Sequence, residues 1–139
     1  MIVTEETKKA AQGVYDFIMM NPERHNQAMW ISGIDGAKIT EANVCNTTLC
    51  AAGAAILLNQ GIEGMNACYD GENYWDEEGA KILGLETNAE IDALFFESNN
   101  EQAKDMLLAI ANGDEDKFRR IAESMRVAEL QAELEADLI

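Results

Sequence analysis

Two thiols five positions apart, Cys45 and Cys50, are the side chains of this chain best suited to chemistry. They stand where a polar turn containing Thr47 and Thr48 passes into the apolar run that begins at Ala51. Either threonine is suited to cap the first free amides of a helix, which places Cys50 in its first turn. Partial positive charge there lowers the pKa of a thiol. The spacing therefore predicts either a reactive cysteine or a closely packed core helix.

A cysteine nucleophile needs a base, and His25 is the single histidine of the chain. Cys50 or Cys45 with His25 has the residue types of a Cys–His pair, and Asn43 or Asp35 could orient the imidazole. The alternative is that both thiols are small apolar side chains of a core. Because no spacing places His25 beside a thiol, we favour the core interpretation and assign no catalytic residue.

Two metal sites are conceivable from residue types. Cys45, Cys50, Cys68 and His25 would make a Cys₃His zinc set, but the Cys-x₄-Cys spacing is wide and the second thiol lies inside a helix. The acidic stretch 70–78 is dense in oxygen ligands, yet it lacks the glycine and the acid that a calcium loop needs at its sixth and fifth positions. We favour neither site and expect no metal and no cofactor.

Charge is the second strong signal. The chain has 26 acidic and 10 basic residues, a net charge of −16. Residues 61–139 hold twenty of these acids against six Lys or Arg, a net −14, and twelve of the acids lie between Glu63 and Asp105. A field of this sign repels nucleic acid and attracts basic surfaces. The alternative is an acidic surface that serves solubility alone.

We predict a partner-binding surface in this acidic segment. Carboxylates on helices can be spaced like phosphates along a groove, so the segment would suit the basic cleft of a nucleic-acid-binding protein. Tyr69, Tyr74 and Trp75 lie close together within it, and aromatic residues are typical of binding hot spots; for Trp75 we favour a role anchoring the loop. The predicted partner-binding residues are Glu63, Asp70, Glu72, Tyr74, Asp76, Glu77, Glu78, Glu86, Glu90, Asp92 and Glu97.

The elements that must position these residues are mostly helices. Periodicity and capping signals predict helices over 4–20, 48–60, 76–83, 100–112 and 115–138, with a further one starting at the Thr87–Glu90 capping box. The helix 48–60 has small residues on nearly every side and is ended by Gly61, so it should be the centre of the fold. We therefore predict a mainly α, single compact domain of five or six helices spanning 1–139.

Short strands are also expected. Trp30-Ile31 and Lys38-Ile39 could pair as a hairpin across Asp35-Gly36, and Asp70-Gly71 could turn a second one within 62–75.

The last helix carries two apolar stripes, although a surface helix needs only one. Phe118, Ile121 and Met125 belong to the first stripe. The second predicts that the C-terminal helix, residues 114–139, contributes to oligomerisation, as in a homodimer. It consists of Val127, Leu130, Leu134 and Leu138.

The N-terminal residues 1–13 are polar and mixed in charge, without the apolar stretch of a signal peptide. The longest apolar run is broken by Gly53 and is too short to span a bilayer. Three cysteines, an odd number, suit free thiols. We therefore expect a cytoplasmic protein with no membrane contact, located in the host cell cytoplasm if a phage encodes it.

Several short motifs follow one another over residues 21–95. They are Asn21-Pro22-Glu23, Trp30, Cys45–Gly53, Leu83–Thr87 and Leu94-Phe95. Their order resembles a family of small uncharacterised phage and bacterial proteins with a Trp followed by Cys-Gly-Thr-x-x-Cys-x-Ala-Gly. Cys45, Thr47, Cys50, Ala52 and Gly53 match that motif, whereas Asn46 replaces its glycine. The resemblance implies a phage-type accessory protein and brings no established activity.

Together these observations predict an acidic, non-catalytic protein that binds and blocks a basic, nucleic-acid-handling host or defence protein. The alternative is a small thiol-dependent enzyme, or a protein that sequesters a small ligand, using Cys50 and Cys45 with His25.

Overall fold

Helix α1 (Glu5–Met20) shows how local sequence determines structure in this chain. In the computed structural model, which describes residues 1–138, Thr4 and Thr7 cap each other's backbone amides at 3.1 and 3.0 Å. Ala11 and Val14 recur on the buried face. Asn21 ends the helix directly before Pro22, as predicted, because proline disfavours helix in the residue before it.

The described residues form one mainly helical domain of seven α-helices, with two short turns of other helical types and one small antiparallel sheet. This confirms the predicted fold class. The elements after α1 are the 3₁₀ turn η1 (Pro22–Arg24), β1 (Ile31–Ser32), α2 (Glu41–Val44), β2 (Thr48–Leu49), α3 (Ala51–Tyr69), α4 (Trp75–Leu83), α5 (Asn88–Ile91), the π-helical turn η2 (Asp92–Glu97), α6 (Asn100–Ala111) and α7 (Glu115–Asp137).

Helix α3 lies in the core, as its small residues predict. Residues 51–56 are all buried. A Cβ atom on Gly53 would lie 2.2 Å from the carbonyl oxygen of Trp30, so only glycine permits this approach. A Cβ on Gly79 of α4 would lie 2.9 Å from the Cβ of Ala52. The two glycines thus let a loop and a helix pack directly against α3.

Gly61 ends the first part of the central helix, as predicted, because its φ of 70° and ψ of −164° are not helical. A second helical part follows directly and carries α3 to Tyr69, so the predicted hairpin within 62–75 is wrong. The strand at Ile31 pairs with Leu49 rather than with the 38–39 segment. The physical reason is that Ile39 is held by the Asn66 side chain, which accepts from its amide at 2.7 Å and donates to its carbonyl at 2.8 Å.

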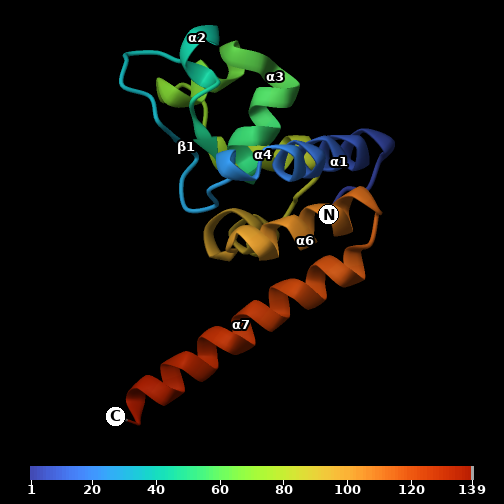
Figure 1. Ribbon diagram of the computed structural model, residues 1–139. Helices are drawn as coiled ribbons and strands as arrows, with labels where there is room; N and C mark the ends of the chain where they lie inside the picture. The colour runs from blue at the N-terminus through green and yellow to red at the C-terminus, as the bar shows by residue number, and fades with distance from the viewer. Residues whose placement is uncertain (139) are drawn as a thin grey trace.

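Helix α7 differs from the other helices in its packing. Phe118 and Met125 are buried where its first half meets α6 and η2. From Arg126 to Leu138 every residue is exposed. Figure 1 shows this second half, in red, extending beyond the rest of the molecule, with the C-terminus at its far end. Within residues 1–138, no helix is both long enough and apolar enough to cross a membrane.

Candidate binding groove

The Cys50 thiol lies at the start of α3 but is sealed in the core. Its Sγ atom accepts the Gly53 amide at 3.4 Å, making Cys50 itself the N-cap residue. Thr47 instead donates its hydroxyl to the Val44 carbonyl at 2.6 Å, so the predicted threonine cap is wrong. Desolvation raises the pKa of the Cys50 thiol to about 11, outweighing the helix amides. The predicted lowering of this pKa is therefore also wrong.

The other members of the predicted thiol site serve separate local structures. Cys45 is exposed, with Sγ 3.8 Å from the Glu41 carbonyl, whereas Cys68 is buried. Asn43 completes the capping box of α2, and Asp35 is exposed in the loop that follows β1. In the described part of the chain, no group of three or more His, Cys, Asp or Glu residues could hold a metal ion.

His25 belongs to a buried network centred on Gln27. The imidazole Nε2 lies 2.9 Å from the Gln27 side-chain oxygen, which also accepts the Ala51 amide at 3.0 Å. The Gln27 amide nitrogen donates to the Leu94 carbonyl at 2.7 Å, which leaves the oxygen as the acceptor and makes His25 the donor. Desolvation lowers the pKa of His25, despite the favourable bond to Gln27. The histidine is therefore a buried neutral group near pH 7.

The same network joins the loop after η1 to the end of η2 and the start of α6. The side-chain oxygen of Asn100 accepts from the backbone amide of Gln27 at 2.8 Å, and its side-chain nitrogen donates to the His25 carbonyl at 3.0 Å. Ser98 donates its hydroxyl to the Leu94 carbonyl at 2.6 Å. These bonds hold the two segments, which are about seventy residues apart in sequence, as two walls of one groove.

The groove has a volume of about 1000 Å³ and is largely apolar. Trp30 is central: its ring meets Phe95 edge-on with centroids 6.2 Å apart and Phe96 with centroids 5.2 Å apart. Phe95 is buried, whereas Phe96 is 58% exposed and Met29 is 49% exposed. The remaining lining residues are Asn26, Gln27, Ala28, Ile31, Tyr69, Trp75, Glu97, Ser98, Asn99, Asn100 and Glu101.

The π-helical turn η2 explains why Phe96 reaches the surface. Ala93, Leu94 and Phe95 are consecutive buried residues, which fill the inward arc of this turn. Phe96, next in sequence, lies outside that arc. Turns of this type are frequent at functional sites, because the extra residue per turn redirects side chains.

Carboxylates border the aromatic lining of the groove. Glu97 and Glu101 line it directly. Lys104 pairs with Glu101 at 2.6 Å. Aromatic side chains and negative charge therefore occur together at this site.

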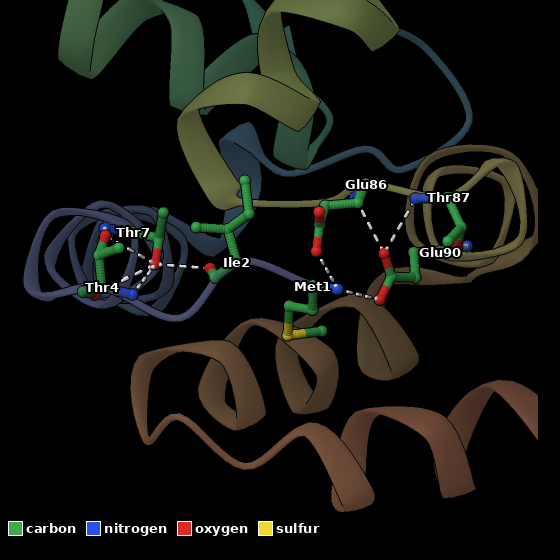
Figure 2. Close-up of polar contacts among 7 residues, drawn as sticks. All are labelled: Met1, Ile2, Thr4, Thr7, Glu86, Thr87 and Glu90. Atoms are coloured by element: carbon green, nitrogen blue, oxygen red, sulfur yellow. Dashed lines mark hydrogen bonds and ion pairs between the residues drawn. The ribbon is translucent and has the colours of Figure 1, made fainter.

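Three of the predicted partner-binding acids form bonds within the fold. The Glu90 carboxylate accepts from the backbone amides of Glu86 and Thr87 at 2.9 and 3.0 Å. The carboxylates of Glu86 and Glu90 pair with the amino group of Met1 at 2.8 and 3.1 Å, and Figure 2 shows this arrangement. Burial alone would raise the pKa of Glu90, but these bonds lower it. Glu78 accepts a bond from Gln60 at 3.0 Å and pairs with Lys81.

The other predicted partner-binding residues are free of such bonds within the described chain, and most are exposed. Tyr74 is 63% exposed between α3 and α4. Asp76 is half-buried at the start of α4. The exposed acids are Glu63, Asp70, Glu72, Glu77, Asp92 and Glu97.

Of the groove lining, the sequence predicts Tyr69, Trp75 and Glu97 as part of a binding surface. It assigns Trp30 only to a motif and a short strand, and it assigns no role to Gln27 or Asn100. One signal was present: Leu94, Phe95 and Phe96 are consecutive, and one helical stripe cannot bury all three.

No known protein family, curated protein or solved structure matches this chain.

Proposed function

We propose that this protein is an acidic, non-catalytic binding protein that takes a basic and aromatic or aliphatic segment of a partner protein into the Trp30 groove. The observation that carries the proposal is the pairing of an exposed aromatic wall with carboxylates. Glu97 and Glu101 line the same groove as Trp30 and the exposed Phe96. Apolar contacts of this kind supply affinity, and the surrounding charge steers a basic partner.

The buried thiols favour binding over nucleophilic chemistry. A thiol acts as a nucleophile when it is ionised and accessible, and Cys50 is neither. His25 is engaged by Gln27 and is 7% exposed. Cys50 and His25 therefore form no assembled thiol site in the part of the chain that the structure describes, and Cys45, although exposed, has no bond there to His25.

The net charge of −16 narrows the class of partner. A surface with this charge competes with nucleic acid for basic clefts, so the proposed partner is a nucleic-acid-handling protein whose cleft or basic segment becomes blocked. The resemblance to small phage-associated proteins adds the expectation of a host or defence protein as the target.

Affinity capture tests this proposal. Immobilised full-length protein should retain a basic partner from host lysate at low salt and release it at high salt. The captured partner, once purified, should lose its bound DNA or RNA when the wild-type protein is added. Absence of a basic partner, or capture that ignores salt, would contradict the proposal.

Two pairs of variants locate the binding surface. Phe96→Ala should reduce capture at least about tenfold, in the range of hot-spot truncations, whereas Met20→Ala, 80% exposed at the end of α1, should not. Asp70→Asn with Glu97→Gln should weaken capture more than Glu6→Gln with Glu23→Gln. Both double variants remove two charges from exposed positions, so a difference reports on location rather than net charge.

A further inference from the structure

The charged residues that line the Trp30 groove are all acidic. Glu97 and Glu101 contribute the two carboxylates, and no Lys or Arg is among the lining residues in the described part of the chain. Glu101 already has a cation, because the Nζ atom of Lys104 lies 2.6 Å from its Oε1 atom. Glu97 is exposed and, within residues 1–138, forms neither an ion pair nor a hydrogen bond. The groove therefore presents one carboxylate that no cation of the chain neutralises.

Most uncharged polar side chains of the groove are committed to the fold. Gln27 and Asn100 each use both the oxygen and the nitrogen of their side-chain amides in the bonds that join the two walls. The hydroxyls of Ser98 and Tyr69 both donate to backbone carbonyls, at 2.6 and 3.2 Å. The strongest polar attraction that the groove offers to a ligand is therefore the charge of Glu97.

The same groove offers aromatic rings to a cation. The ring centroids of Phe96 and Trp30 lie 5.2 Å apart, and Phe96 is 58% exposed. Trp75 and Tyr69 line the groove as well. The faces of aromatic rings attract cations, and tryptophan does so most strongly. A cation that enters the groove therefore finds both a free carboxylate and several aromatic side chains.

We propose that Glu97 is the specificity-determining residue of the groove and selects a partner segment through an arginine side chain. This inference rests on the proposed function and adds the group that is recognised. A guanidinium group is planar and weakly hydrated, stacks on aromatic rings, and can donate two parallel N–H bonds to one carboxylate. An ammonium group is strongly hydrated and acts as a point charge, so it suits an apolar, aromatic groove less well.

The chain itself contains an arginine in a comparable setting. The guanidinium carbon of Arg24 lies 5.0 Å from the ring centroid of Phe17. Its nitrogens donate to two backbone carbonyls at 2.8 and 3.1 Å. One guanidinium can thus face an aromatic ring and form directed hydrogen bonds at the same time, as the proposal requires at Glu97.

Three short peptides that differ at one position test the assignment. Each has leucine and phenylalanine around a central residue, which is arginine, lysine or citrulline; citrulline keeps the shape of arginine without its charge. Calorimetry measures binding, and the emission of Trp30 and Trp75 reports whether the groove is occupied. The arginine peptide should bind at least about tenfold more tightly than the citrulline peptide and about threefold more tightly than the lysine peptide.

Glu97→Gln tests which carboxylate is responsible. It should weaken binding of the arginine peptide about tenfold and change binding of the citrulline peptide less than about twofold. Glu23→Gln is the matched control, because it removes one charge from an exposed residue of η1 outside the groove, and it should affect neither peptide. Since Glu97 forms no bond within the described chain, its variant should unfold at the same denaturant concentration as the wild type.

The outcomes separate this inference from the proposed function. If the arginine and citrulline peptides bind equally and both change the tryptophan emission, the groove is a binding site but the selection of arginine is overturned. A lysine peptide that binds as tightly as the arginine peptide, or an equal loss of both peptides on Glu97→Gln, would also overturn it. If none of the three peptides binds, the inference and the proposed function are both contradicted.

Discussion

The segment 45–53 and the Trp30 groove use their residues in opposite ways. The segment 45–53 contains the side chains that are chemically most reactive by type, yet Cys50 and Gly53 are buried there in close packing. The second is built from common residue types, yet it leaves Phe96 more than half exposed beside carboxylates. The comparison teaches that accessibility, more than residue type, separates the packing hub of this protein from its candidate binding surface.

The two regions are nevertheless connected. The Trp30 carbonyl lies against Gly53, and Gln27 accepts the first free amide of α3 from Ala51. The packing hub therefore determines where one wall of the groove lies. Disturbing the hub should alter the groove, whereas trimming the groove surface should leave the hub stable.

The largest expected contrast is in thiol reactivity. With a pKa of about 11, the Cys50 thiol is ionised in only about one molecule in a thousand at pH 8, and it is buried as well. A thiol reagent should therefore modify exposed Cys45 in the native protein and reach Cys50 only on unfolding. Mass spectrometry of labelled peptides over time measures this. Rapid native labelling of Cys50 would restore the reactive-site interpretation.

Gly53→Ala should have the next largest effect. Its new Cβ would meet the backbone oxygen of Trp30 at 2.2 Å, which no side-chain rotation relieves, so we expect a loss of about 3 kcal/mol in unfolding free energy. Chemical denaturation measures the change. Gly13→Ala on α1 is the control: no atom lies within 4 Å of the new Cβ, and alanine should stabilise that helix by about 0.5–1 kcal/mol. Equal stability of the two variants would contradict the packing account.

Gln27→Met should cost about 2–3 kcal/mol, because it leaves the Ala51 amide and the His25 imidazole without their buried acceptor. The Leu94 carbonyl still accepts from Ser98. Gln12→Met, at an exposed position of α1, should change stability by less than about 0.5 kcal/mol. A small effect at Gln27 would mean that the network does not hold the groove walls.

The smallest effect is a pH dependence from His25. Its folded pKa is lowered below 6.5 by burial, so the unfolded chain binds a proton first as the pH falls. Its contribution to stability is therefore complete above pH 6.5 and declines as the pH falls from there toward the folded pKa. NMR titration of this single imidazole measures the folded pKa directly. A value at or above 6.5 would contradict the buried neutral state.

Local features of the fold could be predicted from the sequence. The caps at Thr4, Thr87 and Asp114 and the stop at Gly84, whose φ is 78°, depend on residues within a few positions of one another. The small-residue run of α3 identified the packing centre for a similar reason: residues without bulk allow close approach wherever the neighbours come from.

The strand partner of Ile31 and the groove could not be predicted in this way. Asn66 holds Ile39 from 27 residues away, and Asn100 bonds the His25 carbonyl from 75 residues away. No local pattern encodes such contacts. The pKa of Cys50 was predicted in the wrong direction because helix position is visible in the sequence, whereas complete burial is decided by the surrounding fold.

The central claim is that the groove binds the partner, and the two tryptophans test it most directly. Trp30 and Trp75 are the only tryptophans in the chain, and both line the groove, so intrinsic emission reports on its occupancy. Titration with an arginine-rich peptide containing aromatic residues other than tryptophan should shift or quench this emission at low salt, and Phe96→Ala should weaken the response while Met20→Ala does not. Binding of the peptide detected by calorimetry with unchanged tryptophan emission would contradict the account.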